Sequence, residues 1–144
     1  MKTTEPPIIV SQTFAQSVET VWKAITDVSQ MREWFFDTIP SFKAEVGFQT
    51  QFNVKAPSRD FMHLWMVTEV IPQQKLVYNW KYEDLPGDSF VSFELTTENN
   101  ETKLTLTTTV TEDFPDEIPE FARESCIGGW TYFIKQQLVA FLKD

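Results

Sequence analysis

The chain has 144 residues, of which 42% are hydrophobic and 23% are charged, the proportions of an ordinary globular domain. Its formal net charge of −9 repels phosphate backbones and anionic membrane surfaces, so nucleic acid is excluded as an expected partner. Aromatic residues make up 15% of the chain, a high share, and such rings either fill a core or line a cavity.

Neither a membrane segment nor a secretory signal is recognisable in the sequence. No apolar run is long enough to span a bilayer, and the opening residues MKTTEPPIIV lack the apolar stretch and cleavage site of a signal peptide. The single cysteine, Cys126, has no partner for an internal disulfide. These features predict a cytoplasmic protein without membrane insertion.

The first part of the chain predicts a strand followed by helices. Residues 1–7 are interpreted as a flexible leader that ends in two prolines. Residues 8–14, IIVSQTF, are rich in β-branched side chains and predict the first strand. Two short helices are expected next, over 17–26 with Ser17 as the N-cap and over 30–36.

From Phe42 onward the hydrophobic pattern changes to a period of two, which predicts antiparallel strands joined by short turns. The alternating segments are 48–54, 62–70, 76–82, 91–95 and 104–110. Five such strands in succession form a meander with one apolar face.

The second alternating segment, 62–70, has apolar residues on both faces. We assign Met66 and Val70 to the core face, which places His63 and Trp65 on the convex face. A tryptophan exposed there would indicate a subunit contact, so a homodimer is compatible with the sequence.

The last segment, from about 119 to 142, predicts a long helix. Its apolar stripe consists of Ile127, Trp130, Ile134, Leu138 and Phe141. Gly128 and Gly129 lower helix propensity, which we explain by a close approach of the helix backbone to another element, with a simple kink as the alternative. Only this helix is long enough to cover the apolar face of the strands.

The order of elements predicts an α+β domain over residues 8–144, with a curved antiparallel sheet wrapped around the C-terminal helix. Four stretches carry a resemblance to a known family: SVETVWKAITDVSQMREWF (17–35), VTEVIPQQKLVYNWKY (67–82), FVSFELTTENNETKLTLTTT (90–109) and GGWTYFIKQQLVAFL (128–142). The chain resembles the helix-grip (START-like, SRPBCC) superfamily, and within it the bacterial AHSA-like domains named after the activator of the heat-shock chaperone ATPase. That superfamily contains ligand carriers, enzymes and co-chaperone domains, so the resemblance leaves all three open.

No catalytic motif stands out, and no cofactor or metal is expected, because one histidine and one cysteine cannot form the usual zinc sets. We interpret His63 as a surface or rim histidine, with a catalytic base as the alternative. Cys126 is interpreted as a packed cysteine rather than a reactive thiol. The acidic segment 112–117 is interpreted as a solvated loop rather than a cation site.

The apolar and aromatic residues predict the site. Those expected to converge between sheet and helix are Phe48, Phe52, Met66, Tyr78, Trp80, Tyr82, Phe93, Trp130 and Ile134. They form either a filled core or the wall of a pocket, and the resemblance favours the pocket. Tyr78 and Tyr82 would orient the ligand. The resemblance places Arg32 near the mouth, where it would supply a counter-charge, with a solvated charged helix end as the alternative.

The expected function is therefore non-catalytic binding of a small hydrophobic or aromatic ligand in the sheet–helix cavity. Two alternatives stay open. One is a co-chaperone-like module with a chaperone partner, and the other is a cyclase or dehydratase-type enzyme that uses the same cavity.

Overall fold

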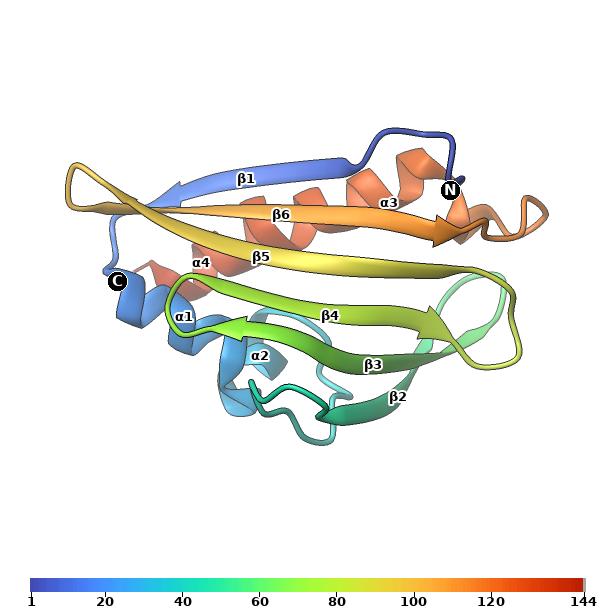
Figure 1. The fold of residues 1–144 in the computed structure, drawn as a ribbon, viewed down its shortest axis with the longest axis horizontal. Coiled ribbons are helices and arrows are strands. Elements are labelled where there is room, and N and C mark those ends of the chain that lie inside the picture. Colours follow the sequence, from blue (N-terminus) through green and yellow to red (C-terminus); the bar gives the residue numbers. More distant parts are fainter. Residues whose placement is uncertain (144) are drawn as a thin grey trace.

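The computed structural model describes residues 1–143 and shows one antiparallel sheet with all helices on one side (Figure 1). The six strands lie in the order β1-β6-β5-β4-β3-β2. Their bounds are β1 Ile8–Phe14, β2 Gln49–Lys55, β3 Asp60–Ile71, β4 Lys75–Tyr82, β5 Asp88–Glu98 and β6 Glu101–Glu112. The meander of five successive strands is confirmed, and β1 pairs with the last of them.

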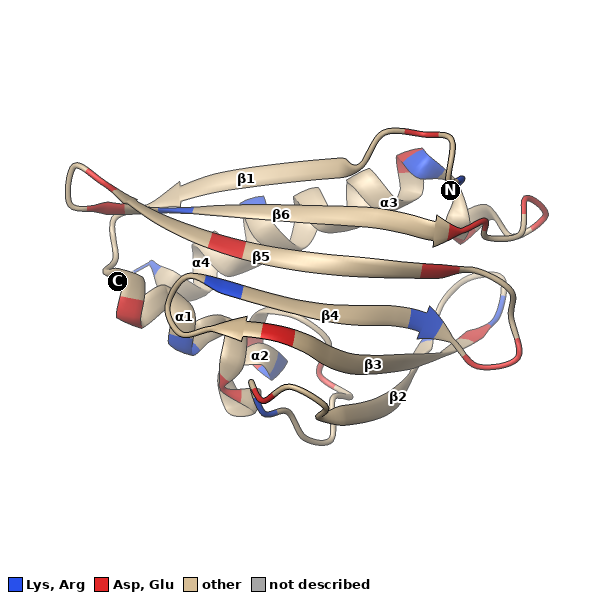
Figure 2. Ribbon diagram, in the orientation of Figure 1, with Lys and Arg blue, Asp and Glu red and all other residues tan. Residues whose placement is uncertain are grey.

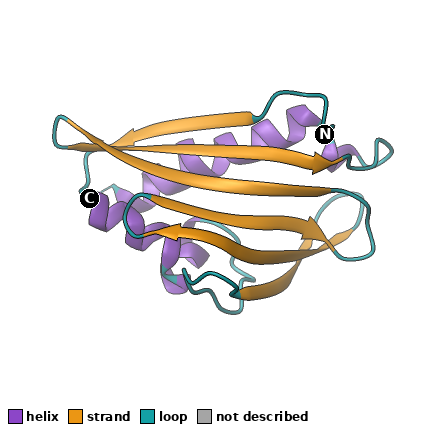
Figure 3. Ribbon diagram, in the orientation of Figure 1, coloured by secondary structure: helices purple, strands orange, loops and turns teal. Residues whose placement is uncertain are grey.

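The helices are α1 (Val18–Thr26), α2 (Val28–Trp34), η1 (Pro119–Phe121), α3 (Arg123–Trp130), the π-helix η2 (Thr131–Gln137) and α4 (Leu138–Leu142). The last three run on from one another as a C-terminal rod, residues 123–142, which lies along the same side of the sheet as α1 and α2 (Figures 1 and 3). The α+β helix-grip class is thus confirmed. Within residues 1–143, every helix is too short or too polar to cross a membrane.

The two short helices begin at side-chain caps. Ser17 Oγ accepts a hydrogen bond from the Thr20 amide at 3.3 Å, and Asp27 Oδ1 accepts one from the Ser29 amide at 2.9 Å. Such caps satisfy backbone N–H groups that have no partner within the helix. The second helix starts two residues earlier than predicted, because its N-cap is Asp27.

Strand β3 contains a β-bulge that the alternating pattern conceals. Val67 pairs with Tyr78 and Glu69 pairs with Val77, so Thr68 is an extra residue with no position of its own in the ladder. An extra residue exchanges the faces to which the following side chains point. The part of β3 before the bulge therefore has the opposite phase from the part after it.

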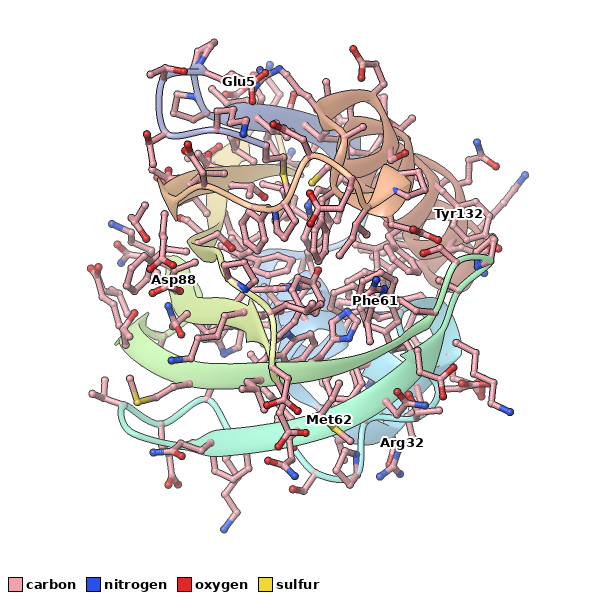
Figure 4. The ribbon with its side chains drawn as sticks, turned by 90° about the vertical axis from the view of Figure 1, so that its right-hand side faces the viewer. Glu5, Arg32, Phe61, Met62, Asp88 and Tyr132 are labelled. Carbon is pink, nitrogen blue, oxygen red and sulfur yellow. The ribbon has the colours of Figure 1, made fainter. Side chains whose placement is uncertain are left out.

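The bulge makes three sequence predictions wrong. Trp65 and His63 point into the core, where they are 2% and 5% exposed, and Met66 is 38% exposed on the outer face of the sheet. Figure 4 shows the same alternation at Phe61, which points into the interior, and at Met62, which points away. A subunit contact through an exposed Trp65 loses its basis, since that ring is buried.

The buried stripe of the C-terminal rod repeats every fourth residue. It consists of Trp130, Ile134, Leu138 and Leu142, none more than 6% exposed. At 3.6 residues per turn such a stripe would drift by roughly 40° at each step. The wider turns of the π-helix η2 offset that drift and keep the stripe on the sheet. The predicted stripe was wrong at Ile127, which is 38% exposed.

The two glycines of α3 do not mark a close approach of backbones. A Cβ atom added at Gly128 or Gly129 would meet nothing within 4 Å, so the explanation given above for this pair is wrong. Only Gly129 borders the space beside Trp130, since Gly128 is exposed on the surface of the helix.

The leader predicted over residues 1–7 lies against the connection between β6 and α3. The amide of Phe114 donates to the Met1 carbonyl at 3.0 Å, and Lys2 Nζ lies 2.9 Å from a carboxylate oxygen of Asp116. These contacts bring the Met1 side chain beside α3, at the end of the sheet where β4 finishes.

Candidate functional site

Much of the predicted aromatic set forms a closed core. Tyr78 and Phe93 are each 1% exposed, and Ile134 is fully buried. The Tyr78 ring centroid lies 4.7 Å from that of Trp65 and 5.7 Å from that of Phe93. Burial raises the pKa of Tyr78 well above its usual value, so the phenol stays neutral. Tyr78 is therefore packed inside the protein rather than presented to a ligand.

Space opens at the other end of the same interface, where β3 and β4 face η1 and α3. A cleft of about 140 Å³ is lined there by Met1, Phe36, His63, Trp80, Tyr82, Glu120, Cys126, Gly129, Trp130 and Phe133. A chamber of about 40 Å³ shares five of these walls, Met1, Trp80, Tyr82, Cys126 and Trp130. Three residues predicted to bind a ligand, Trp80, Tyr82 and Trp130, thus line one cleft.

The chain's single histidine, His63, lies in the wall of the cleft. Its Nδ1 is 3.1 Å from the carbonyl oxygen of Phe61. A carbonyl only accepts, so Nδ1 carries the proton and Nε2 presents a lone pair. Burial lowers the pKa of His63 to about 4, so the ring is neutral at pH 7.

Tyr82 contributes the hydroxyl group of the cleft. The indole Nε1 of Trp80 donates to Tyr82 Oη at 2.9 Å, so the oxygen is an acceptor in this bond. Among residues 1–143 nothing accepts the hydroxyl hydrogen in turn. Burial raises the pKa of Tyr82 far above its usual value and keeps that hydrogen in place. The rings of Tyr82 and His63 lie edge to face, with centroids 4.8 Å apart.

Cys126 and Gly129 form the helix side of the cleft. Burial raises the pKa of the Cys126 thiol to about 11, which keeps the sulfur protonated and favours its interpretation as a packed cysteine. Gly129 lines the cleft without a side chain, and a Cβ there would project into open space. The volume of the cleft thus depends on a glycine at this position.

Glu120 is the one charged side chain among the residues that line the cleft. Its carboxylate accepts from the Ser58 amide at 3.1 Å and from Ser58 Oγ at 2.5 Å, and these bonds lower its pKa. Figure 2 shows acidic stretches gathered at this end of the sheet, around the start of β5 and the end of β6. The ammonium group of Met1, which donates to the Phe121 carbonyl at 2.6 Å, brings a positive charge to the same cleft and opposes that of Glu120.

Arg32 is held away from the cleft by the loop that follows α2. Its Nε donates to the Ile39 carbonyl at 2.7 Å and its Nη2 to the Pro40 carbonyl at 2.8 Å. Figure 4 shows the side chain on the outer side of the molecule. Arg32 therefore stabilises this loop and does not line the cleft.

The remaining predicted residues also lie outside the cleft. Phe52 packs edge to face on Trp65 with centroids 4.7 Å apart, and Phe48 packs on Phe42 at 6.0 Å. Met66 lines an outer-face hollow of about 420 Å³, together with glutamine and lysine side chains. That hollow is larger than the cleft, but its polar rim favours water over an apolar ligand.

Several residues of the cleft could not be found from the sequence pattern. Phe36 and Phe133 pack edge to face with centroids 5.0 Å apart, and Met1 reaches the cleft from a different part of the chain. No periodic signal marks these residues, because they come from a loop, a π-helix and a terminal segment. His63 could have been found from the regular alternation of residues 61–67, had the bulge been recognised.

The comparisons with known proteins agree with this fold. The family described as Activator of Hsp90 ATPase homolog 1-like protein matches residues 15–143. No curated protein matches the sequence.

Three solved structures illustrate the structural likeness. A Chromobacterium violaceum protein is 21% identical with a TM-score of 0.77, over 96% of this chain and 98% of that one. A Mesorhizobium loti protein is 25% identical with a TM-score of 0.72, over 96% and 99%. The Aha1 dimer from Colwellia psychrerythraea is 21% identical with a TM-score of 0.69, over 96% and 97%. Because the family matches nearly the whole chain and the fold agrees, this protein belongs to the Activator of Hsp90 ATPase homolog 1-like family.

Proposed function

We propose that the cleft binds one small, neutral, ring-sized hydrophobic ligand and that the protein does not transform it. The observation that carries this proposal is a space with aromatic walls between the sheet and α3, which has room beside Gly129. A volume near 140 Å³ matches that of an apolar cavity able to hold a single benzene ring, about 150 Å³. The protein would act in the cytoplasm as a carrier or sensor.

The size of the cleft limits the affinity that apolar contact can provide. A single ring buries on the order of 150 Å² of surface, worth about 4 kcal/mol at roughly 25 cal/mol per Å². A net binding energy of that size corresponds to a Kd of about 1 mM, and the loss of ligand freedom weakens it further. Tight binding therefore requires polar contacts in addition to burial.

The test uses toluene as a purely apolar probe and two neighbouring glycines as a matched pair. Gly129→Leu places a side chain in the cleft, whereas Gly128→Leu places the same side chain at an exposed position outside its wall. We expect toluene to shift NMR signals of the cleft residues in the wild type and in Gly128→Leu, but not in Gly129→Leu. Equal binding by both variants, or none by the wild type, would contradict the proposal.

A second candidate function is a co-chaperone-like interaction module, which the family match and the dimeric Aha1 neighbour favour. Purified protein would then accelerate ATP hydrolysis by the Hsp90 of its own host. Native mass spectrometry of the same sample would report a homodimer if one forms. An unchanged ATPase rate over a wide concentration range would argue against this candidate.

A further inference from the structure

Two hydrogen-bonding groups in the wall of the cleft are unused, and they are of opposite kinds. His63 Nε2 is an acceptor, because Nδ1 carries the proton and donates it to the Phe61 carbonyl oxygen, 3.1 Å from Nδ1. The Tyr82 hydroxyl is a donor, because its oxygen already accepts from Trp80 at 2.9 Å. Neither group has a further hydrogen-bond partner among residues 1–143.

The rings that carry these two groups pack against each other. The rings of His63 and Tyr82 are packed edge to face with centroids 4.8 Å apart, and both line the cleft. Both residues are held in place: the His63 ring stacks on Phe52 at 5.0 Å, and Tyr82 is fixed by its bond from Trp80. A donor and an acceptor fixed side by side in an apolar wall recognise a group that both donates and accepts.

A neutral hydroxyl group meets that requirement with a single oxygen. It can donate its hydrogen to His63 Nε2 and accept the hydrogen of Tyr82. A carboxylate has no hydrogen to donate, so it would leave His63 Nε2 without a partner. A purely apolar ring would leave both protein groups without a partner once water is displaced.

We propose that the His63–Tyr82 pair makes the cleft selective for single-ring ligands that carry a neutral hydroxyl, the phenol class. This inference rests on the proposed function and specifies its ligand. Phe36, Trp130 and Phe133 provide the apolar surface for the ring.

The experiment compares phenol with toluene, which has nearly the same shape but carries a methyl group in place of the hydroxyl. In an apolar cavity without partners the hydroxyl is unfavourable, so toluene would bind more tightly. With two hydrogen bonds offered by the protein, we expect phenol to bind at least about five-fold more tightly than toluene. Benzoate serves as the anionic probe and should bind more weakly than phenol.

Two variants assign the selectivity to the pair. Tyr82→Phe and His63→Phe should each weaken phenol binding about five-fold and change toluene binding less than about two-fold. Retained toluene binding shows that a variant is folded with its cleft intact. Two results would overturn the assignment of the selectivity to His63 and Tyr82. One is a folded variant that binds neither phenol nor toluene, and the other is unchanged phenol binding in both variants.

A measurement on the wild type does not depend on any variant. Because the chain has one histidine, its imidazole nitrogens give a single pair of ¹⁵N NMR signals. They should report the tautomer protonated at Nδ1, and the Nε2 signal should move when phenol is added but not when toluene is added. Toluene binding without phenol preference, or an Nε2 signal unmoved by phenol, would overturn the inference and leave the proposed function standing. Failure of both probes to bind would overturn both.

Discussion

The two ends of the interface between the sheet and the C-terminal rod are built from the same residue types but pack differently. Around Phe93, Tyr78 and Leu138 the side chains interlock and are at most 1% exposed. Around His63 and Tyr82 the rings enclose a cleft of about 140 Å³ and present unpaired polar groups. One layer of the fold thus provides stability at one end and a candidate binding site at the other, and the difference arises from a few small or polar residues rather than from topology.

The largest expected effect lies at the closed end. Phe93→Ala removes a ring that is 1% exposed and leaves a cavity, so it should lower the free energy of unfolding by about 3–5 kcal/mol. Urea denaturation measures this loss, and Ile9→Ala, at an outer-face position 63% exposed, should change stability by less than about 0.5 kcal/mol. A loss below about 1 kcal/mol for Phe93→Ala would show that this end is not tightly packed.

The next effect lies at the open end and depends on pH. The folded-state pKa of His63 is lowered from 6.5 to about 4, so the unfolded chain takes up the proton first as the pH falls. Stability therefore decreases as the pH falls from about 6.5 towards 4, and between pH 7 and pH 5 the loss is about 2 kcal/mol. The other titratable groups at the same cleft are Tyr82, Cys126, Glu120 and the amino group of Met1. Between pH 7 and pH 5 Tyr82 and Cys126 stay protonated and Glu120 stays ionised in the folded state.

Urea denaturation at the two pH values checks this loss, with His63→Phe as the control. The variant should lose much less stability than the wild type over the same interval, because no proton is taken up at this position. An equal loss in both proteins would place the cause elsewhere in the chain.

The smallest effect separates stability from binding within α3. Gly128→Ala and Gly129→Ala should each raise the free energy of unfolding by up to about 1 kcal/mol, since alanine favours the helix and its Cβ meets nothing within 4 Å. Only Gly129→Ala should also weaken toluene binding, because only Gly129 lines the cleft. Parallel denaturation and NMR titration measure the two quantities. Equal effects of both variants on toluene binding would show that Gly129 does not line the binding site.

The sequence predicted most of the fold because the strands alternate regularly and the caps stand at the helix starts. β1 begins and ends at the residues expected, Ile8 and Phe14. The phase of β3 could not be predicted, because Val70 after the bulge and the residues before it follow opposite patterns. Met66 was therefore assigned to the wrong face, and the inward position of His63 was missed.

The alternating pattern of the strands also could not predict which aromatic residues belong to the core and which line the cleft. Tyr78 and Tyr82 are equivalent in the alternation of β4, yet only Tyr82 reaches the cleft. The difference depends on which side chains approach from the other layer. Arg32 shows the same limit, since its backbone partners Ile39 and Pro40 belong to a loop whose path no periodicity describes.

The extra residue at Thr68 has a consequence for how this family can change in length. Deleting Thr68 would exchange the two faces of β3 on one side of the bulge. The inner side chains of that segment would then point to water. If the later segment kept its phase, His63 and Trp65 would be turned to the surface. A relative without this inserted residue is therefore expected to have lost the buried imidazole, whereas a length change in the hairpin at Asn99 and Asn100 would leave it in place.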